Sequence, residues 1–221
     1  MKELFSSIAG RYDRMNRIMS LALDLRWRRV ALEHATMPPS GPVLDLACGT
    51  GDFTAEILRR CPDAAITGLD LAPAMLDLAR AKLGNHRNVT LVAGDAQDLS
   101  RFASSSFALV VCAFGFRNFH DKPRVLAECR RVLSPGGELV VLELFRPTSR
   151  IVGACVNAWL GIVAAAFARG AASEYAYLRR SIANTVSAQE FERLAERAGF
   201  VVASRRNLFP AATCITLSAA V

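Results

Sequence analysis

The chain has 221 residues, 52% of them hydrophobic, and a formal net charge of +7. This length and composition suit one domain, or one domain with an insertion, and exclude an intrinsically disordered chain. The basic excess indicates an anionic partner, either nucleic acid or the phospholipid face of a membrane, and charge alone does not choose between them.

The N-terminal segment is too rich in charge for a secretory signal and is predicted to form an amphipathic helix. One face carries apolar residues at helical spacing, namely Ile8, Tyr12, Met15 and Met19. The basic residues are Arg11, Arg14 and Arg17 on the adjacent face, followed by Arg26, Arg28 and Arg29 around Trp27. This basic surface is either a solvated helix face or a contact with anionic lipid headgroups.

The stretch VLDLACGTGD, from Val43 to Asp52, is predicted to form a buried strand, a glycine-containing turn and the start of a helix. In such a turn, Gly49 and Gly51 let the backbone approach a ligand where a Cβ would clash. The acid of the next predicted strand, Asp70, can accept hydrogen bonds from a ribose diol. This arrangement is typical of a parallel α/β sheet that holds a nucleoside.

The identity of the nucleoside is predicted from two departures from the dinucleotide-binding pattern. Thr54 stands where that pattern has its third glycine, and Asp52 at the start of the helix would repel a bound phosphate. S-adenosylmethionine contains no phosphate, and its positively charged sulfonium is compatible with Asp45 and Asp52. The motif therefore predicts S-adenosylmethionine as the cofactor, with an ordinary strand-to-helix turn as the alternative.

After the proline-rich break at residues 38–42, strands and helices are predicted to alternate as in a doubly wound α/β sheet. Strands are expected near residues 43–47, 65–70, 89–93, 107–113 and 138–144, and helices near residues 53–60, 74–83 and 122–133. A turn at Ser134–Gly137 ends the last of these helices, a further helix lies near 187–198, and two final strands lie near 200–205 and 213–217. Ligands in such sheets bind at the carboxyl ends of the strands, where these motifs lie.

The stretch from Ile151 to Ala168 is almost entirely apolar and lies between two predicted strands. Its length is near the lower limit for a membrane span. It is interpreted as a transmembrane helix, as a plain core helix, or as the wall of an apolar substrate tunnel or a membrane-facing lid. A membrane span would separate the final strands from their sheet, which disfavours the first interpretation.

The six cysteines include no C-x-x-C pair and are expected to be reduced core residues of a cytosolic protein. The three histidines have no ligand spacing relative to one another or to the cysteines, so no metal site is expected. Neither a disulfide framework nor a metal centre therefore enters the predicted chemistry.

Several motifs resemble the ubiquinone/menaquinone C-methyltransferase family of S-adenosylmethionine-dependent enzymes. They are FSSIAGRYDRMNRIMS from Phe5, VLDLACGTGD, FGFRNFHD from Phe114, LSPGGELVVLELFRP from Leu133 and SEYAYLRRSI from Ser173. The resemblance implies an α/β class I methyltransferase fold, Rossmann-like, with a seven-stranded and mostly parallel sheet whose last strand is antiparallel. It also implies a helical lid at residues 1–38 and a methyltransferase domain at residues 39–221 with a helical insertion at about 148–186.

The resemblance implies methyl transfer to a ring carbon of a polyprenylated quinol in isoprenoid quinone biosynthesis, with demethylmenaquinol to menaquinol as the leading reaction. The residues expected at the cofactor are Asp45, Gly49, Thr50, Gly51, Asp70, Leu71, Asp95, Ala96 and Ala113. The residues expected at the substrate are Tyr12, Asn16 and Phe116. Tyr12, Asp13 and Asn16 would lie on the lid, with local packing and capping of the helix as their alternative role. The chain departs from the family where it has Ala113 for a frequent serine, Phe116 for leucine, and Pro210–Ala212 for a glycine-containing turn.

A ring carbon becomes a good nucleophile when a neighbouring hydroxyl ionises, and a phenol with a pKa of about 10 reaches its phenolate at pH 7 at a cost of about 4 kcal/mol. Arg117, expected at the end of the fourth strand, can hold the phenolate or orient a water that takes the proton. Asn118 can fix the second ring oxygen or the loop. The alternatives are a surface ion pair of Arg117 with Asp121 or Glu143, and His120 as the general base.

A lipid substrate predicts a protein that works at the membrane without crossing it. The basic N-terminal face and the apolar stretch at residues 151–168 would then form one surface that docks on an anionic membrane. The sequence predicts a cytoplasmic, peripherally membrane-associated enzyme, and it leaves a homodimer open. No nucleic-acid partner is expected, because FGFRN stands where amino-methylating enzymes of nucleic acids carry an Asn/Asp-Pro-Pro-aromatic block. A methyltransferase of a soluble small molecule and a non-catalytic cofactor-binding scaffold are the competing functions.

Overall fold

A computed structural model describes residues 2–38, 41–167 and 172–219 of the chain. Its centre is a seven-stranded sheet in the order β3-β2-β1-β4-β5-β7-β6. The strands are β1 (Val43–Leu46), β2 (Ile66–Asp70), β3 (Val89–Ala93), β4 (Phe107–Ala113), β5 (Leu133–Glu143), β6 (Phe200–Leu208) and β7 (Ala212–Ala219). Neighbours from β3 to β5 pair in parallel, whereas β7 runs antiparallel to both β5 and β6. The predicted sheet, mostly parallel with an antiparallel last strand, is confirmed.

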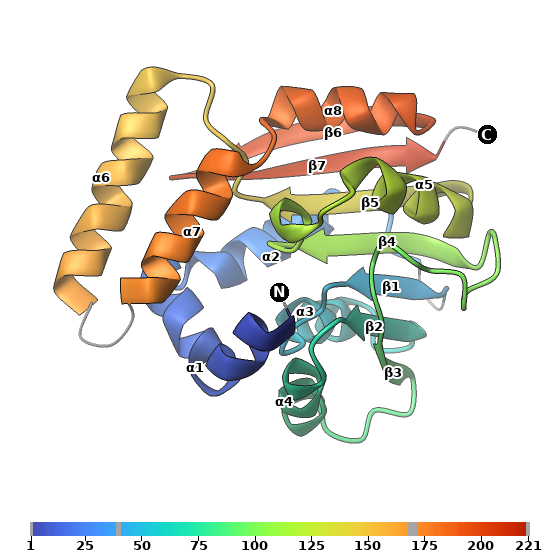
Figure 1. The fold of residues 1–221 in the computed structure, drawn as a ribbon. Coiled ribbons are helices and arrows are strands. Elements are labelled where there is room, and N and C mark those ends of the chain that lie inside the picture. Colours follow the sequence, from blue (N-terminus) through green and yellow to red (C-terminus); the bar gives the residue numbers. More distant parts are fainter. Residues whose placement is uncertain (1, 39–40, 168–171, 220–221) are drawn as a thin grey trace.

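Helices cover both faces of the sheet (Figure 1). The helices α2 (Leu23–Glu33), α3 (Asp52–Arg60) and α4 (Pro73–Leu83) bury their apolar side chains against one face. The helices α5 (Lys122–Val132) and α8 (Ala188–Arg197) cover the other face. Because the central strands are buried on both sides, they are unbroken apolar runs, such as the four buried residues from Leu109 to Cys112 in β4.

The carboxyl ends of the central strands point toward one end of the molecule (Figure 1). At that end lie α1 (Lys2–Ser20), α6 (Arg150–Phe167) and α7 (Ala172–Asn184), together with the short 3₁₀ helix η1 (Phe116–Asn118) that follows β4. The N-terminal helix and the segment between β5 and α8 therefore meet over the edge of the sheet where ligands are expected.

Three strands extend beyond their predicted limits. Strand β5 begins at Leu133, because Leu133 pairs with Phe107 on β4, and the pairing resumes only between Glu138 and Leu109. The predicted turn at Ser134–Gly137 is therefore a bulge within β5. Strands β6 and β7 lengthen because their hairpin pairs as far as Leu208 with Ala212.

The apolar stretch at residues 151–168 forms α6, and its last residue, Ala168, lies outside the described residues. None of the described helices is both long and apolar enough to cross a membrane. Ile151 and Ile162 are 77% and 65% exposed although Val156 is buried, so α6 does not fit the interpretation as a plain core helix. The wall of a substrate tunnel or a lid stays a prediction.

The first two helices meet at a tight turn. Leu21 and Ala22 adopt positive φ angles of 50° and 59° there. This turn brings Asp24 of α2 against Arg17 of α1, and Arg17 also pairs with Asp52 of α3 over 2.7 Å. Arg17 therefore faces the protein and joins α1 to the rest of the fold.

The predicted basic N-terminal face is wrong for two of its residues. Arg11 and Arg14 are exposed, as expected. Arg17 forms ion pairs within the fold, and Arg28 is 6% exposed and pairs with a carboxylate of its own helix. The side chain of Ile8, predicted on the apolar face, lies outside the described residues.

Candidate active site

The turn after β1 is held in place by the acid at the end of β2. The backbone N–H of Gly49 donates to Oδ2 of Asp70 and that of Ala72 donates to Oδ1, each over 2.8 Å. Gly49 has a φ of +55°, and a Cβ there would meet nothing nearer than the Tyr12 ring at 4.0 Å. The glycine therefore borders open space, and the backbone at this point can approach a ligand.

A cavity of about 850 Å³, its mouth included, lies over this turn and is called the loop cavity. Six of the nine residues expected at the cofactor line it, namely Gly49, Asp70, Leu71, Asp95, Ala96 and Ala113. Gln97, which the sequence analysis did not select, also lines it. The Gln97 backbone N–H donates to Asp95 over 2.9 Å, and its side-chain oxygen accepts from the N–H of Asp121 over 2.7 Å. The sequence Asp-Ala-Gln after β3 is the signal that could have found Gln97. In an Asx turn the aspartate side chain accepts a hydrogen bond from the backbone N–H two residues further on, which here belongs to Gln97.

The lining of the loop cavity suits the nucleoside of S-adenosylmethionine. A carboxylate has more acceptor positions than two backbone N–H groups fill, so Asp70 can still accept from a ribose diol. Burial raises the pKa of Asp70, and the N–H groups that it accepts oppose the rise. Leu71, Met75 and Phe119 add apolar walls against which an adenine ring can pack. The donors, acceptors and apolar walls thus fit an adenosyl group.

Three of the residues expected at the cofactor lie outside the loop cavity. Asp45 is buried beneath the turn and accepts a hydrogen bond from Thr54 Oγ1 over 2.6 Å. Thr50 is also buried, and its hydroxyl donates to Asp13 of α1 over 2.5 Å. Gly51 packs on α4, where a Cβ would lie 3.0 Å from a leucine side chain. These residues therefore support the turn through contacts with α1, α3 and α4 and do not border the loop cavity.

Asp45 is expected to make the stability of the protein depend on pH. Burial raises the pKa of its carboxyl from 3.8 to about 7, and the hydrogen bond from Thr54 opposes the rise only in part. The folded protein therefore keeps a proton that the unfolded chain releases, so this stabilisation is full below about pH 4 and is lost as the pH rises through 7. The loss is roughly 4 kcal/mol. Urea unfolding between about pH 5 and pH 8 should follow this fall in the wild type, and identical profiles for wild type and Asp45→Asn would contradict it.

Replacing Asp70 by alanine is expected to lower the affinity for S-adenosylmethionine by about ten- to a hundredfold. The change removes an acceptor for the ribose and frees the N–H groups of Gly49 and Ala72, so the turn loses its anchor. Calorimetric titration measures the effect. The matched control is Asp77→Ala on α4, because the Asp77 side chain is 73% exposed and pairs with Arg80 on the same helix. Equal affinities for Asp70→Ala and Asp77→Ala would remove Asp70 from cofactor binding.

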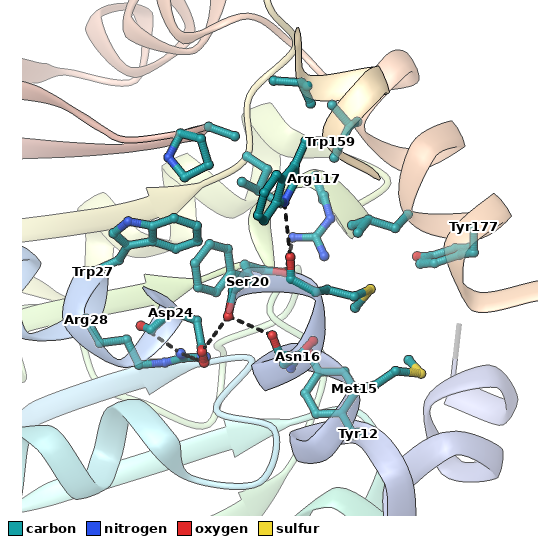
Figure 2. Close-up of a pocket in the computed structure, with 18 residues that line it drawn as sticks. Tyr12, Met15, Asn16, Ser20, Asp24, Trp27, Arg28, Arg117, Trp159 and Tyr177 are labelled. Carbon is teal, nitrogen blue, oxygen red and sulfur yellow. Dashed lines mark hydrogen bonds and ion pairs between the residues drawn. The ribbon is translucent and has the colours of Figure 1, made fainter. Parts of the chain in front are cut away.

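A second cavity, of about 1000 Å³ with its mouth, adjoins the loop cavity and is called the arginine cavity. Figure 2 shows its lining residues, which come from α1, α2, α6, α7, η1 and the segments that follow β4, β5 and β6. Most of them are apolar: Met15, Met19, Trp27, Phe114, Leu144, Val156, Trp159, Leu178, Ile182, Pro210 and Ala211. Tyr12 and Phe114 line both cavities and so stand between them.

Phe114 is held in a strained conformation at this boundary. Its φ of +59° lies in the left-handed region, which costs a non-glycine residue about 1–2 kcal/mol. The Arg28 guanidinium lies 5.2 Å from the centre of its ring, and the Trp27 ring packs at 6.1 Å. Packing on both sides holds the residue in place, so the wall between the two cavities is well fixed.

Arg117 lines the arginine cavity from η1, and its side chain is 9% exposed. Its Nη1 lies 2.7 Å from Oε1 of the fully buried Glu143 and also donates to the carbonyl oxygen of Phe114. Burial lowers the pKa of Arg117, but Glu143 outweighs this effect, so the pKa lies above its ordinary value. Among the described residues, Nη2 of Arg117 has no hydrogen-bond partner. The ion pair of Arg117 with Glu143, expected at the surface, is therefore present but buried, and it leaves Nη2 of the guanidinium available.

The residues on either side of Arg117 divide between the loop cavity and the core. Asn118 lines the loop cavity and accepts a hydrogen bond from the Tyr177 hydroxyl of α7 over 2.9 Å. His120 is exposed and lines the same cavity. Phe116 is 2% exposed and packs edge-on against two other phenylalanines in the core. The structure therefore brings Arg117 to the arginine cavity and places the Phe116 side chain away from both cavities.

A buried carboxylate at the arginine cavity escaped the sequence analysis. Asp24 is 3% exposed, accepts from the Ser20 hydroxyl over 2.8 Å, and pairs with Arg28 over 2.7 Å. Nε of Arg28 is buried and has no partner among the described residues. The i,i+4 spacing of Asp24 and Arg28 on a helix with apolar neighbours is the signal that could have found this pair.

Ion pairs fasten α1 over the turn of the loop cavity. Lys82 of α4 lies 2.6 Å from Asp13 of α1 and 2.6 Å from Asp52 of α3, and Arg17 also pairs with Asp52. Burial raises the pKa of Asp52, but Arg28, Lys82 and Arg17 outweigh it and hold that pKa below its ordinary value. The carboxylate of Asp52, which the sequence sets against a bound phosphate, therefore forms ion pairs with Arg17 of α1 and Lys82 of α4, and its effect on a phosphate stays a prediction.

Comparison with known proteins places this geometry in a family. Residues 1–219 match the ubiE/COQ5 methyltransferase family. The demethylmenaquinone methyltransferase of Deinococcus radiodurans is 44% identical over 200 residues, which cover 89% of this chain and 81% of that protein. The protein of the same name from Thermotoga maritima is 39% identical, with 90% and 87% covered. The ubiquinone/menaquinone biosynthesis C-methyltransferase UbiE of Citrifermentans bemidjiense is 36% identical, with 90% and 87% covered.

Solved structures agree with the fold. An S-adenosylmethionine-dependent methyltransferase from Aquifex aeolicus superposes with a TM-score of 0.70 at 16% identity, over 97% of this chain and 98% of that one. The geranyl diphosphate C-methyltransferase of Streptomyces coelicolor gives a TM-score of 0.66 at 15% identity, over 87% and 74%. These two likenesses concern the fold alone, whereas the family match spans the chain. The protein is an S-adenosylmethionine-dependent methyltransferase and belongs to the ubiE/COQ5 methyltransferase family.

Proposed function

We propose that the protein methylates a ring carbon of a polyprenylated quinol, with demethylmenaquinol as substrate and menaquinol as product. The names of its relatives support this choice, because the proteins that are 44% and 39% identical are both called demethylmenaquinone methyltransferase. The relative at 36% identity carries a ubiquinone and menaquinone name. A benzoquinol acceptor is therefore the second candidate.

The observation that carries the proposal is the meeting of two cavities at one fixed wall. The loop cavity suits the cofactor, and the arginine cavity is apolar with a charged guanidinium at its side. Tyr12 and Phe114 border both of them. A flat, apolar aromatic acceptor in the arginine cavity would lie next to the methyl donor. Such positioning can lower the free-energy barrier to reaction by roughly 7 to 11 kcal/mol.

S-adenosylmethionine supplies an electrophilic methyl group when it is bound. The protein must then make the ring carbon nucleophilic, which requires partial or full ionisation of a neighbouring hydroxyl. Nη2 of Arg117 can donate to that oxygen, while Glu143 holds Nη1 and fixes the direction of the guanidinium. A donor that is fixed in advance stabilises developing charge without reorganisation. Asn118, held by Tyr177, is then the residue that positions the neighbouring loop.

The substrate proposed here resides in a bilayer, so the enzyme would work as a peripheral membrane protein on the cytoplasmic side. The net charge of +7 and the exposed Arg11 and Arg14 favour an anionic membrane surface. Each methylene of the tail that the protein buries contributes about 0.8 kcal/mol to binding. Association of two copies stays a prediction.

The test is a methyl-transfer assay with isotopically labelled S-adenosylmethionine. The purified protein is given demethylmenaquinol, a benzoquinol with the same tail and a soluble phenol, and each product is identified by mass. Label on the naphthoquinol ring is the expected result. Preferential labelling of the benzoquinol would select the second candidate, and label on the soluble phenol alone would contradict a lipid substrate. Cofactor binding without turnover on any acceptor would favour a non-catalytic scaffold.

A further inference from the structure

We infer that a third cavity, between α6 and the β6–β7 hairpin, is the channel through which the isoprenoid chain of the substrate leaves the arginine cavity toward the membrane. This inference rests on the proposed function, because it assigns the tail of the same quinol. The third cavity, called the hairpin cavity, encloses about 1210 Å³ with its mouth. Its walls are the segment after β5, Val152 and Val156 of α6, Ile182 of α7, the start of α8 and residues 205 and 207–213 of the hairpin.

The hairpin cavity adjoins the arginine cavity through a shared apolar wall. Five residues line both cavities: Leu144, Val156, Ile182, Pro210 and Ala211. All five are apolar, and they come from the segment after β5, from α6, from α7 and from the tip of the hairpin. A substituent on a ring beside Arg117 can therefore pass along this wall without meeting a charged group.

The two charged residues that line the hairpin cavity, Arg146 and Arg205, are already paired. Arg146 lies 2.7 Å from Glu190, and Arg205 lies 3.5 Å from Glu192. The buried part of the lining is mainly apolar and includes Phe145, Ala188 and Ala212. An anionic ligand would have to compete with these pairs, whereas a hydrocarbon chain needs only apolar surface. The lining thus favours an isoprenoid chain over a free phosphate or an acidic peptide.

The mouth of the hairpin cavity exposes large apolar side chains. Phe209 at the hairpin tip is 87% exposed, and Ile151 and Val152 at the start of α6 are 77% and 48% exposed. The neighbouring Arg150 and Arg206 are exposed and have no ion-pair partner among the described residues. Apolar side chains next to unpaired cations complement the surface of an anionic bilayer, where a polyprenylated quinol would enter.

The first test measures the preference for the tail. Two acceptors are compared, a quinol that carries several isoprene units and the same ring with a methyl group in place of the chain. In the wild type we expect kcat/KM to be at least about tenfold higher for the isoprenylated quinol. Val152→Glu and Phe209→Glu should reduce this ratio by about tenfold, because each places a carboxylate in the path of the hydrocarbon.

A matched control separates the channel from a general effect of added charge. Val201 lies at the other end of β6, outside the three cavities, and is 57% exposed. Val201→Glu should keep the wild-type ratio of kcat/KM values. Thermal unfolding of all three variants checks that they are folded.

The second test measures docking without turnover. Vesicles of phosphatidylcholine with phosphatidylglycerol are floated with the protein at low salt. The wild type and Val201→Glu should float with the vesicles, whereas Phe209→Glu should stay behind, and added salt should reduce the bound fraction of the wild type.

The outcomes distinguish the channel from the proposed function. A wild type that methylates the quinol without any preference for the tail, or a Phe209→Glu variant that keeps both the preference and the flotation, overturns the channel while the proposed function stands. A wild type that methylates neither quinol contradicts the proposed function itself. A dimer in solution that Phe209→Glu dissociates, with no flotation of the wild type, would show that a second copy of the chain covers this face and would also overturn the channel.

Discussion

Replacing Arg117 by alanine is expected to lower turnover by roughly a hundred- to a thousandfold, while the affinity for S-adenosylmethionine changes by less than about threefold. The split follows from the geometry, because Arg117 lines the arginine cavity and not the loop cavity. Its loss removes the cation nearest the proposed phenolate and leaves the cofactor contacts in place. Single-turnover kinetics measure the first effect, and calorimetric titration of the cofactor measures the second.

Because Arg117 pairs with Glu143, the effect of the alanine substitution on stability must be separated from its effect on turnover. Glu143 has no exposed surface, and the alanine variant leaves its carboxylate without the guanidinium. Removing one member of a buried ion pair typically destabilises a protein by about 3–5 kcal/mol. The double variant Arg117→Met with Glu143→Gln removes both charges and keeps most of the volume. We expect it to recover most of the stability and to remain slow.

Two results would separate a structural role from a catalytic one. If the double variant regains turnover together with stability, Arg117 supports the fold and does not act on the substrate. If both variants lose cofactor affinity as strongly as turnover, the assignment of Arg117 to the acceptor side of the site is wrong. The alanine variant alone cannot make this distinction, because unfolding and lost catalysis both lower its rate.

The sheet could be predicted from the sequence because its signals are local. A parallel strand buried on both faces is a short apolar run, and those at Val43–Leu46 and Phe107–Ala113 are bounded by turn residues on the chain itself. The extra length of β5 could not be predicted, because it depends on the pairing of Leu133 with Phe107 on another strand. The same holds for the extended hairpin of β6 and β7.

The site was predictable where one motif carries several contacts. Gly49 lies in the turn after β1, and Asp70 ends the neighbouring parallel strand β2. The contact between them therefore follows from the order of the strands. The burial of Asp24 and Glu143 depends on how α1, α2 and η1 pack, which no short pattern encodes. The inward direction of Arg17 has the same origin, because the turn at residues 21–22 sets the angle between the two helices.

Removal of residues 1–20 is expected to abolish measurable methyl transfer and to weaken cofactor binding by at least about a hundredfold. Tyr12 borders both cavities, and Met15, Asn16 and Met19 line the arginine cavity, so the deletion opens both cavities to water. Circular dichroism checks that the sheet persists. Tryptophan emission should shift to the red, because Nε1 of Trp159 donates to a carbonyl oxygen of α1 over 3.4 Å.

A milder change tests whether the closure of α1 over the loop cavity matters by itself. Asp13→Asn removes a carboxylate whose side chain is 36% exposed and that pairs with Lys82. Because partly exposed pairs contribute at most about 1 kcal/mol, the variant should stay folded and should raise KM for the cofactor by several-fold with little change in kcat. Asp77→Asn, which breaks an exposed pair on α4, should change neither constant. Full activity of a folded deletion variant would instead assign α1 to local packing, and the wall between the two cavities would then have to function without Tyr12.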